Sequence, residues 1–169
     1  MSYLHNHSVI FRDLKPQNIG FDVRGDVKIF DFGLSRIMPE NGDPYRDKFN
    51  MSGAGSPRYM APECLDVADY NLKADVYTFS VVLWEVLSAQ TPFVHVRSRD
   101  ELVRHVVDEG GRPRIDPTWP VPIQGMLECG FDPDMGRRPV SEMIRYLWEE
   151  VCIVKETFSS HTIVHLFRK

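Results

Sequence analysis

The chain has 169 residues, of which 43% are hydrophobic and 26% charged, and its formal net charge at pH 7 is −4. This ordinary composition predicts one globular domain and excludes collagen, coiled coil and low-complexity disorder. No apolar run approaches the roughly 20 residues of a membrane span, and there is no surplus of basic residues to attract nucleic acid. Cys64, Cys129 and Cys152 lack the spacing of a metal site or disulfide framework, so we expect free thiols in a reducing compartment.

The first third of the chain is predicted to form short strands and turns. Val9 to Arg12 is apolar and β-branched, and two similar runs, Ile19 to Asp22 and Val27 to Phe30, flank a turn that contains glycine. This order predicts a small β-hairpin. From Asp31 to Glu63 no period is sustained, and glycines and prolines interrupt the segment. A structureless segment of this length is uncommon in compact domains and is usually functional.

The remainder is helical in pattern. Ala74 to Leu87 is apolar nearly all round, which predicts a helix buried in the middle of the domain. Further helices are predicted at Arg99 to Glu109, Ile123 to Cys129 and Val140 to about Lys155, the last with Ser141 as a cap. Thr157 to Lys169 fits either a strand or a tail. The fold class expected from this pattern is mainly α, with one or two short hairpins.

Three motifs follow one another in the first 63 residues. Phe11-Arg12-Asp13-Leu14-Lys15-Pro16-Gln17-Asn18 is followed by Asp31-Phe32-Gly33 and then by Ala61-Pro62-Glu63. Each motif alone is a weak signal, but their order, their spacing and the buried helix after them resemble the catalytic half of a eukaryotic protein kinase. The resemblance implies the C-terminal lobe of the bilobal (α+β) kinase fold over residues 1–155, with a tail at 156–169. The N-terminal lobe, with its glycine-rich loop and its lysine, is expected to be absent.

The resemblance also assigns chemistry to four polar residues. Asp13 would accept the proton of the substrate hydroxyl, and Lys15 would neutralise the transferring phosphoryl group. Asn18 and Asp31 carry the hard oxygen ligands that suit Mg²⁺, so ATP and Mg²⁺ are the implied cofactors. The alternative for either aspartate, taken singly, is a turn or capping role. Phe32 and Gly33 are assigned structural roles beside Asp31.

The choice of acceptor follows from other residues. Lys15-Pro16 and Ser56 resemble serine/threonine kinases, in which the hydroxyl residue contacts the catalytic aspartate and lysine. The run from Asp75 to Glu85 and the later Arg138-Pro139 resemble the tyrosine-kinase-like group, which shares these helices yet phosphorylates serine and threonine. We therefore expect a protein substrate, a serine/threonine kinase of this group and a cytoplasmic location. The oligomeric state stays open.

Regulatory and scaffold roles are implied for further residues. Arg12 would grip a phosphate on the activation segment, with Ser52 as the first candidate phosphosite and Tyr45 as the second; a plain solvated serine is the alternative for Ser52. Glu63 and Arg138 resemble a structural ion pair, and Asp75 would brace the catalytic loop. His5 and His7 are expected to be structural, because a spacing of two does not face one side of a helix.

The chain departs from the family pattern in three ways. Phe11 replaces the usual histidine and cannot form its hydrogen bond, so we expect a less ordered Asp31. Gly20 replaces a bulky residue under the adenine ring, so we expect a thinner nucleotide contact. With the N-terminal lobe missing, the chain alone is expected to have little or no activity. A non-catalytic, pseudokinase-like protein-binding module is therefore the alternative function, whereas the Ala-Pro-Glu motif and Ser56 argue against a small-molecule phosphotransferase.

Overall fold

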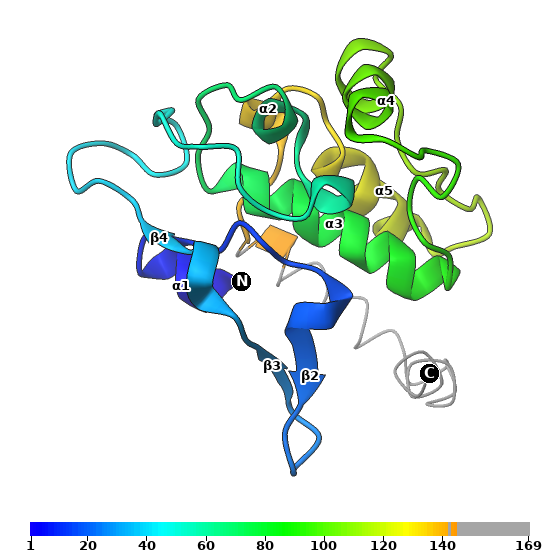
Figure 1. Ribbon diagram of the computed structural model, residues 1–169. Helices are drawn as coiled ribbons and strands as arrows, with labels where there is room; N and C mark the ends of the chain where they lie inside the picture. The colour runs from blue at the N-terminus through cyan, green and yellow to red at the C-terminus, as the bar shows by residue number, and fades with distance from the viewer. Residues whose placement is uncertain (142, 145–169) are drawn as a thin grey trace.

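The computed structural model describes residues 1–141, 143 and 144, and its centre is the helix α3 (Lys73–Ser88) (Figure 1). Val76, Tyr77 and Val81 on this helix are almost fully buried. The predicted buried helix is therefore confirmed, with one more residue at each end. Its low amphipathicity has a simple cause, since neighbouring elements cover it on most sides.

Two small antiparallel sheets precede this helix. β2 (Ile19–Phe21) pairs with β3 (Val27–Ile29) in the predicted hairpin, with Ile19 opposite Ile29. β1 (Val9–Ile10) pairs with β4 (Arg36–Ile37), a strand that lies in the segment predicted to be structureless. The β2–β3 hairpin extends away from the helices (Figure 1).

Shorter helices complete the described part of the chain. They are α1 (Ser2–Asn6), α2 (Pro62–Leu65), α4 (Arg99–Val103) and α5 (Val121–Gly130). The helix predicted at Arg99 to Glu109 is present, but its second half, Arg104–Asp108, is a π-helix. Single 3₁₀ turns occur at Pro16–Asn18, Phe32–Leu34, Pro57–Tyr59 and Met135–Arg137. The described helices include none with the length and apolarity to cross a membrane.

Most of the C-terminal predictions fall outside the described residues. The helix expected at 140–155 is described only at its first positions, and the tail at 156–169 is not described. Ser141 is buried there, and its backbone carbonyl accepts a hydrogen bond from the Ser2 hydroxyl at 3.0 Å.

A buried ion pair joins the first turn of α2 to the turn after α5. The Arg138 guanidinium donates to both carboxylate oxygens of Glu63, at 2.6 and 2.8 Å, and the arginine side chain is fully buried. Its Nε also donates to the Asp132 carbonyl at 2.9 Å, and the guanidinium carbon lies 5.2 Å from the centre of the Tyr77 ring. Paired on both oxygens and further hydrogen-bonded, this charge is well compensated although it is buried.

We predict that Glu63→Gln lowers the free energy of unfolding by about 3–5 kcal/mol, because it leaves the buried Arg138 charge unpaired. Urea denaturation of the full chain measures the loss. The matched control is Arg104→Gln, which breaks an exposed 3.7 Å pair with Glu109 and should change stability by at most about 1 kcal/mol. Equal effects of the two substitutions would contradict the role given to the buried pair.

Candidate active site

The loop after β1 is tied to the central helix by one carboxylate. Asp75, near the start of α3, accepts hydrogen bonds from the backbone N–H groups of Phe11 at 2.7 Å and Arg12 at 2.8 Å. The buried His5 ring lies 3.0 Å from the same carboxylate through its Nε2. Arg12 has a φ of 71°, a left-handed conformation that costs a non-glycine residue about 1–3 kcal/mol. Asp75 thus holds a strained turn at Arg12, and this turn sets the direction of the following residue, Asp13.

Asp13, Lys15, Asn18 and Ser56 form one hydrogen-bonded cluster. Lys15 Nζ donates to Asp13 Oδ2 at 2.7 Å and to Ser56 Oγ at 2.9 Å. The Ser56 hydroxyl and backbone N–H donate to the other oxygen, Asp13 Oδ1, at 2.8 and 2.9 Å. Asn18 Nδ2 donates to the Asp13 carbonyl at 2.9 Å and to Oδ2 at 3.1 Å. Two neighbours on the same loop therefore hold one oxygen of the Asp13 carboxylate, and Ser56, 43 positions further along the chain, holds the other.

These contacts decide the charge of Asp13. Burial opposes ionisation, but hydrogen bonds from Lys15 and Ser56 and the lysine charge outweigh it, so the pKa of Asp13 lies below its ordinary value. Because folding lowers this pKa, the ionised carboxylate stabilises the fold above the unfolded-state pKa, and that contribution is lost as the pH falls through the folded-state pKa. Asp13 is consequently a carboxylate at neutral pH, able to accept a hydrogen bond from a hydroxyl group.

Asp31 lies at the same end of the hairpin as Asn18. The backbone N–H of Phe30 donates to the Asn18 carbonyl at 3.1 Å, which continues the β2–β3 register by one pair. Asp31 follows Phe30 directly and therefore lies just beyond this pair. Asp31 has a φ of 65°, and its side chain accepts the Gly33 N–H at 3.3 Å. A Cβ at Gly33 would lie 3.2 Å from Asp31 Oδ1, so glycine leaves room for this turn.

The oxygen atoms at this end of the hairpin fit Mg²⁺. Asn18 is buried and offers an amide oxygen, whereas Asp31 is exposed and offers a carboxylate. The described residues contain no group of three or more His, Cys, Asp or Glu that would hold a metal ion by themselves. Mg²⁺ is commonly bound by one or two protein ligands together with phosphate oxygens, and this pair matches that mode.

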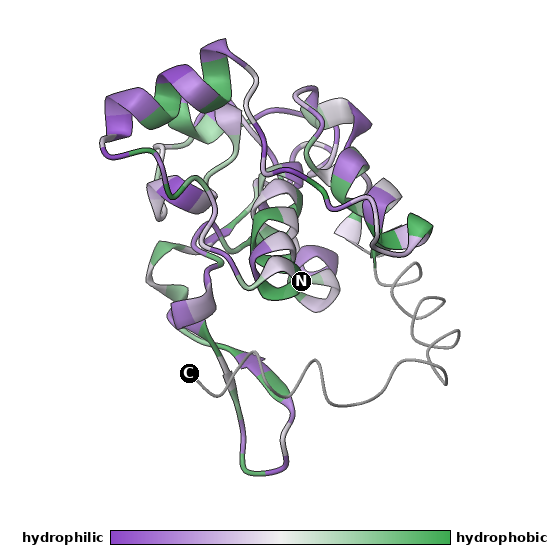
Figure 2. Cartoon of the chain, turned by 90° about the vertical axis from the view of Figure 1, so that its right-hand side faces the viewer, coloured by the Kyte–Doolittle hydropathy of each residue, from purple (hydrophilic) through white to green (hydrophobic). Residues whose placement is uncertain are grey.

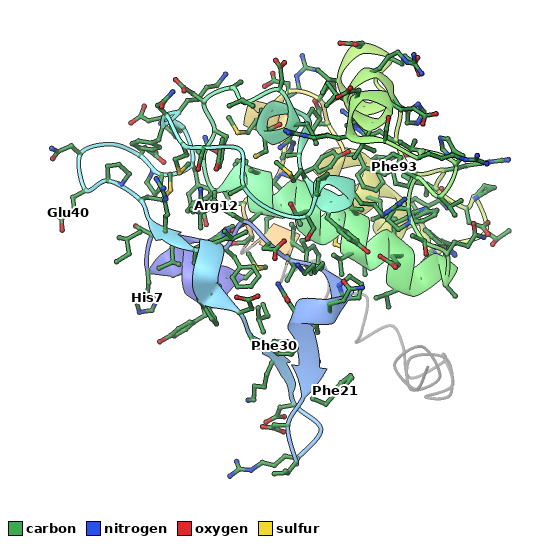
Figure 3. All side chains as sticks on the ribbon, in the orientation of Figure 1. His7, Arg12, Phe21, Phe30, Glu40 and Phe93 are labelled. Carbon is green, nitrogen blue, oxygen red and sulfur yellow. The ribbon has the colours of Figure 1, made fainter. Side chains whose placement is uncertain are left out.

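Two departures from the family pattern have structural consequences. The Phe11 ring is fully buried and meets the Phe32 ring edge-on, with centroids 5.2 Å apart. Phe11 therefore makes an apolar contact in place of the hydrogen bond that the usual histidine would form. At Gly20 a Cβ would lie 3.1 Å from the Phe30 ring, which therefore covers the space that the glycine leaves. Figure 3 shows Phe30 on the hairpin, with about half of its surface exposed. The thin surface expected at Gly20 is therefore partly filled by Phe30.

The Arg12 side chain is already engaged inside the protein. Its Nε donates to the Leu34 carbonyl at 2.5 Å, and its Nη1 lies 3.2 Å from the Tyr70 hydroxyl and 3.4 Å from the Ser52 carbonyl. The Tyr70 hydroxyl also donates to the Ser52 carbonyl at 2.8 Å. Arg12 is thus beside Ser52, but it contacts the backbone, and the exposed Ser52 side chain is accessible to solvent. Tyr45, the second candidate phosphosite, is half-buried, with its hydroxyl 3.2 Å from Ser141 Oγ.

Several contacts in this region had no sequence signal. Tyr70 is 58 positions from Arg12, and His5 is 70 positions from Asp75. Beyond Ser56, the Tyr59 hydroxyl donates to Glu85 at 2.8 Å. Burial raises the pKa of Glu85 even though Tyr59 and Arg58 oppose the rise. None of these pairs belongs to a local motif, so only the folded chain brings them together.

We predict that Lys15→Met raises the pKa of Asp13, because the substitution removes its shortest hydrogen bond and a neighbouring positive charge. Carboxyl NMR titration of the full chain measures this pKa directly. Lys28→Met is the matched control, since in the described part of the chain the ion pairs of Lys28 are with Asp22 and Asp26 of the hairpin, and it should leave the Asp13 titration unchanged. An unchanged titration in Lys15→Met would contradict the account of the cluster.

Comparisons with known proteins agree with this geometry. Residues 1–161 match the protein kinase domain family. The chain is 39% identical over 140 residues to the dual specificity protein kinase shkB of Dictyostelium discoideum, covering 82% of this chain and 21% of that protein. It is 34% identical over 155 residues to the serine/threonine-protein kinase STY17 of Arabidopsis thaliana, covering 89% of this chain and 26% of that protein. The chain thus spans about a fifth to a quarter of the length of these relatives, and by the extent of the family match it belongs to the protein kinase domain family.

Proposed function

We propose that this chain is the C-terminal lobe of a serine/threonine protein kinase of the tyrosine-kinase-like group. The lobe would span residues 1–155, with a tail at 156–169, and the reaction would transfer the γ-phosphate of ATP to a serine or threonine of a protein. One observation carries the proposal: Lys15, Asn18 and Ser56 hold both oxygens of the Asp13 carboxylate within 3.1 Å. The free thiols Cys64 and Cys129 support a reducing location, the cytoplasm.

Each residue of the cluster has a role in this reaction. Asp13 orients the acceptor hydroxyl and takes its proton, and Lys15 neutralises charge on the transferring phosphoryl group. Asn18 and Asp31 would hold Mg²⁺, which supplies charge neutralisation at the phosphate oxygens when it is bound. Because phosphoryl transfer needs little covalent work from the protein, such positioning is the main contribution of these side chains.

The choice of serine and threonine rests on Ser56. Its hydroxyl donates to Asp13 and accepts from Lys15, so it stands beside the groups that would meet the acceptor. The names of the relatives include both serine/threonine and dual specificity kinases, and the contacts of Lys15 with Ser56 favour the first class. Glu63 with Arg138, and Asp75 with the loop backbone, serve as scaffold in this proposal.

A specific observation favours a second candidate, a non-catalytic protein-binding module. The β2–β3 hairpin exposes large apolar side chains, among them Phe21 at 49%, Val27 at 61% and Phe30 at 48% exposed. Figure 2 shows hydrophobic residues along this hairpin, which extends away from the helices. Such surface marks an interaction site more often than a solvated face. The 169 residues contain no glycine-rich loop and no Val-Ala-Ile-Lys motif, so we propose little turnover by this chain alone. If the purified chain nevertheless shows Mg²⁺-dependent ATP turnover, and Asp31→Ala abolishes it, the kinase is favoured over the binding module.

We predict that the full-length product of the gene transfers labelled phosphate from ATP to serine and threonine, as phosphoamino acid analysis would show. Asp13→Asn should lower kcat by about 10²–10⁴-fold, because the amide cannot take the hydroxyl proton. Asp108→Asn, at an exposed carboxylate of the π-helix, is the matched control and should leave kcat unchanged. Label on tyrosine alone, or full activity in Asp13→Asn, would refute the proposal.

We predict that Phe30→Ala raises the KM for ATP roughly tenfold with little change in kcat, because it removes the aromatic surface beside Gly20 on which an adenine would rest. Steady-state kinetics of the full-length product with varied ATP concentration measure both kcat and KM. Val23→Ala, at the fully exposed tip of the same hairpin, serves as the control. A fall in kcat with KM unchanged would place Phe30 in a different role.

A further inference from the structure

A cavity of about 370 Å³ lies at the N-terminal end of α3, where three segments meet. The 45–48 segment, the start of α3 and the turn after α5 line it, and their polar lining residues are Tyr45, Arg46, Lys48, Asn71, Lys73 and Asp134. None of these residues has a place in the proposed phosphoryl transfer. Its volume is within the range of about 300–1,000 Å³ typical of small-molecule sites.

The charge that lines this cavity is unbalanced. Arg46, Lys48 and Lys73 carry three positive charges, and Asp134 is the one carboxylate among the lining residues. That carboxylate is partly occupied, because it accepts the Gly136 N–H at 2.9 Å and lies 3.6 Å from Arg137 Nε. The lining residues alone carry an excess of two positive charges, which Asp43, beside Arg46, partly offsets.

Lys73 is the buried member of this set, with 7% of its surface exposed. Its ammonium group donates to the Arg138 carbonyl, a neutral acceptor that leaves the charge uncompensated. Burial and the nearby Arg138 charge lower the pKa of Lys73, and Asp43 only partly opposes them. A bound anion would relieve this cost.

The other two cations are free to turn toward a ligand. Among the described residues Arg46 has an ion pair with Asp43, with Nε 3.5 Å from Oδ2, and their side chains are 87% and 45% exposed. Such an exposed pair contributes about 0–1 kcal/mol. Lys48 is exposed and has no ion pair within the described part of the chain. A planar arginine fork and a mobile ammonium group together are the donors that phosphate recognition uses.

We propose that this cavity binds a phosphate monoester, with Arg46 and Lys48 as its ligands and Lys73 as a buried positive charge in the lining. An anion matches the net positive charge of the lining, and the cavity has room for the group that carries the phosphate. The phosphate belongs either to a free small molecule or to a phosphorylated side chain. The assignment does not depend on catalysis by Asp13.

Such a ligand would join segments that already meet. Asn71 Nδ2 donates to the Tyr45 carbonyl at 3.0 Å, and the Leu72 N–H donates to the Pro44 carbonyl at 3.2 Å. A phosphate held by Arg46, Lys48 and Lys73 would add charge-assisted bonds across the same junction. The 43–48 part of the segment between Asp31 and Glu63 would thereby be fixed to α3, which is a means of regulating the site.

Calorimetric titration of the full chain tests the proposal with two probes. One is inorganic phosphate, and the other is a short alanine-rich peptide with a single phosphoserine, compared with its unphosphorylated form. The double variant Arg46→Gln/Lys48→Gln should weaken binding about tenfold or more, because two charge-assisted contacts are lost. Tighter binding of the peptide assigns the site to a phosphorylated side chain, and equal or tighter binding of inorganic phosphate assigns it to a free ligand.

Two controls make the result decisive. Arg24→Gln/Arg97→Gln removes the same charge at exposed positions outside the cavity and should leave binding unchanged. Asp134→Asn keeps the acceptor for Gly136 but removes the opposing charge, and it should tighten binding, an effect that misfolding does not mimic. No binding of either probe at millimolar concentration, or binding equal in the wild type and the Arg46/Lys48 variant, overturns the proposal.

Discussion

The carboxylate of Asp75 is the constraint on which the arrangement of this site depends. It is almost fully buried on the central helix and accepts from two consecutive backbone N–H groups, with the His5 ring on the same oxygen as Phe11. A buried carboxylate needs such donors to remain favourable. Because the donors are on the loop, satisfying Asp75 and shaping the loop are the same event. The left-handed conformation of Arg12 is maintained in this way, and the direction of Asp13 follows from it.

The other end of the site is held by a second buried charge. Arg138 connects Glu63, at the start of α2, with the Lys73 and Asp132 carbonyls. Ser56 lies a few residues before Glu63, so its position relative to Asp13 depends on where that segment is held. α3 therefore serves as a common base, with Asp75 holding the loop and the region around Lys73 holding the end of the segment. Mutual orientation of Asp13 and Ser56 is a property of this base and not of either segment alone.

The substitutions at Phe11 and Gly20 show how packing replaces polar contacts. Phe11 meets Phe32 through ring edges, and Phe30 covers Gly20 from the neighbouring strand. Apolar contacts are less directional than hydrogen bonds, so they fill the space without replacing the directionality of a hydrogen bond. Arg12 shows a related effect, since its guanidinium donates to the Leu34 carbonyl and to the Tyr70 hydroxyl within the fold.

The positions of the main helix and of the β2–β3 hairpin, and the family, could be predicted from patterns in the amino-acid sequence. The central helix follows from a run that is apolar nearly all round and the β2–β3 hairpin from a glycine turn between two short apolar runs, and both were found at the predicted positions. The order of Asp13, Asp31 and Glu63 in their motifs was enough to indicate the family that the comparisons then showed. Local pattern carries this information because helix, turn and motif each depend on residues close together in the chain.

The contacts between residues far apart in the chain could be learned from the folded structure alone. The pairing of β4 with β1, the contact of His5 with Asp75, the use of Arg12 by Tyr70 and the group of cations around Lys73 all join residues far apart in the chain. Such contacts depend on how α3 is covered by its neighbours, and no spacing along the chain records that. The physical reason is that burial selects contact partners by shape and by unsatisfied hydrogen-bonding capacity in three dimensions, which spacing along the chain does not specify.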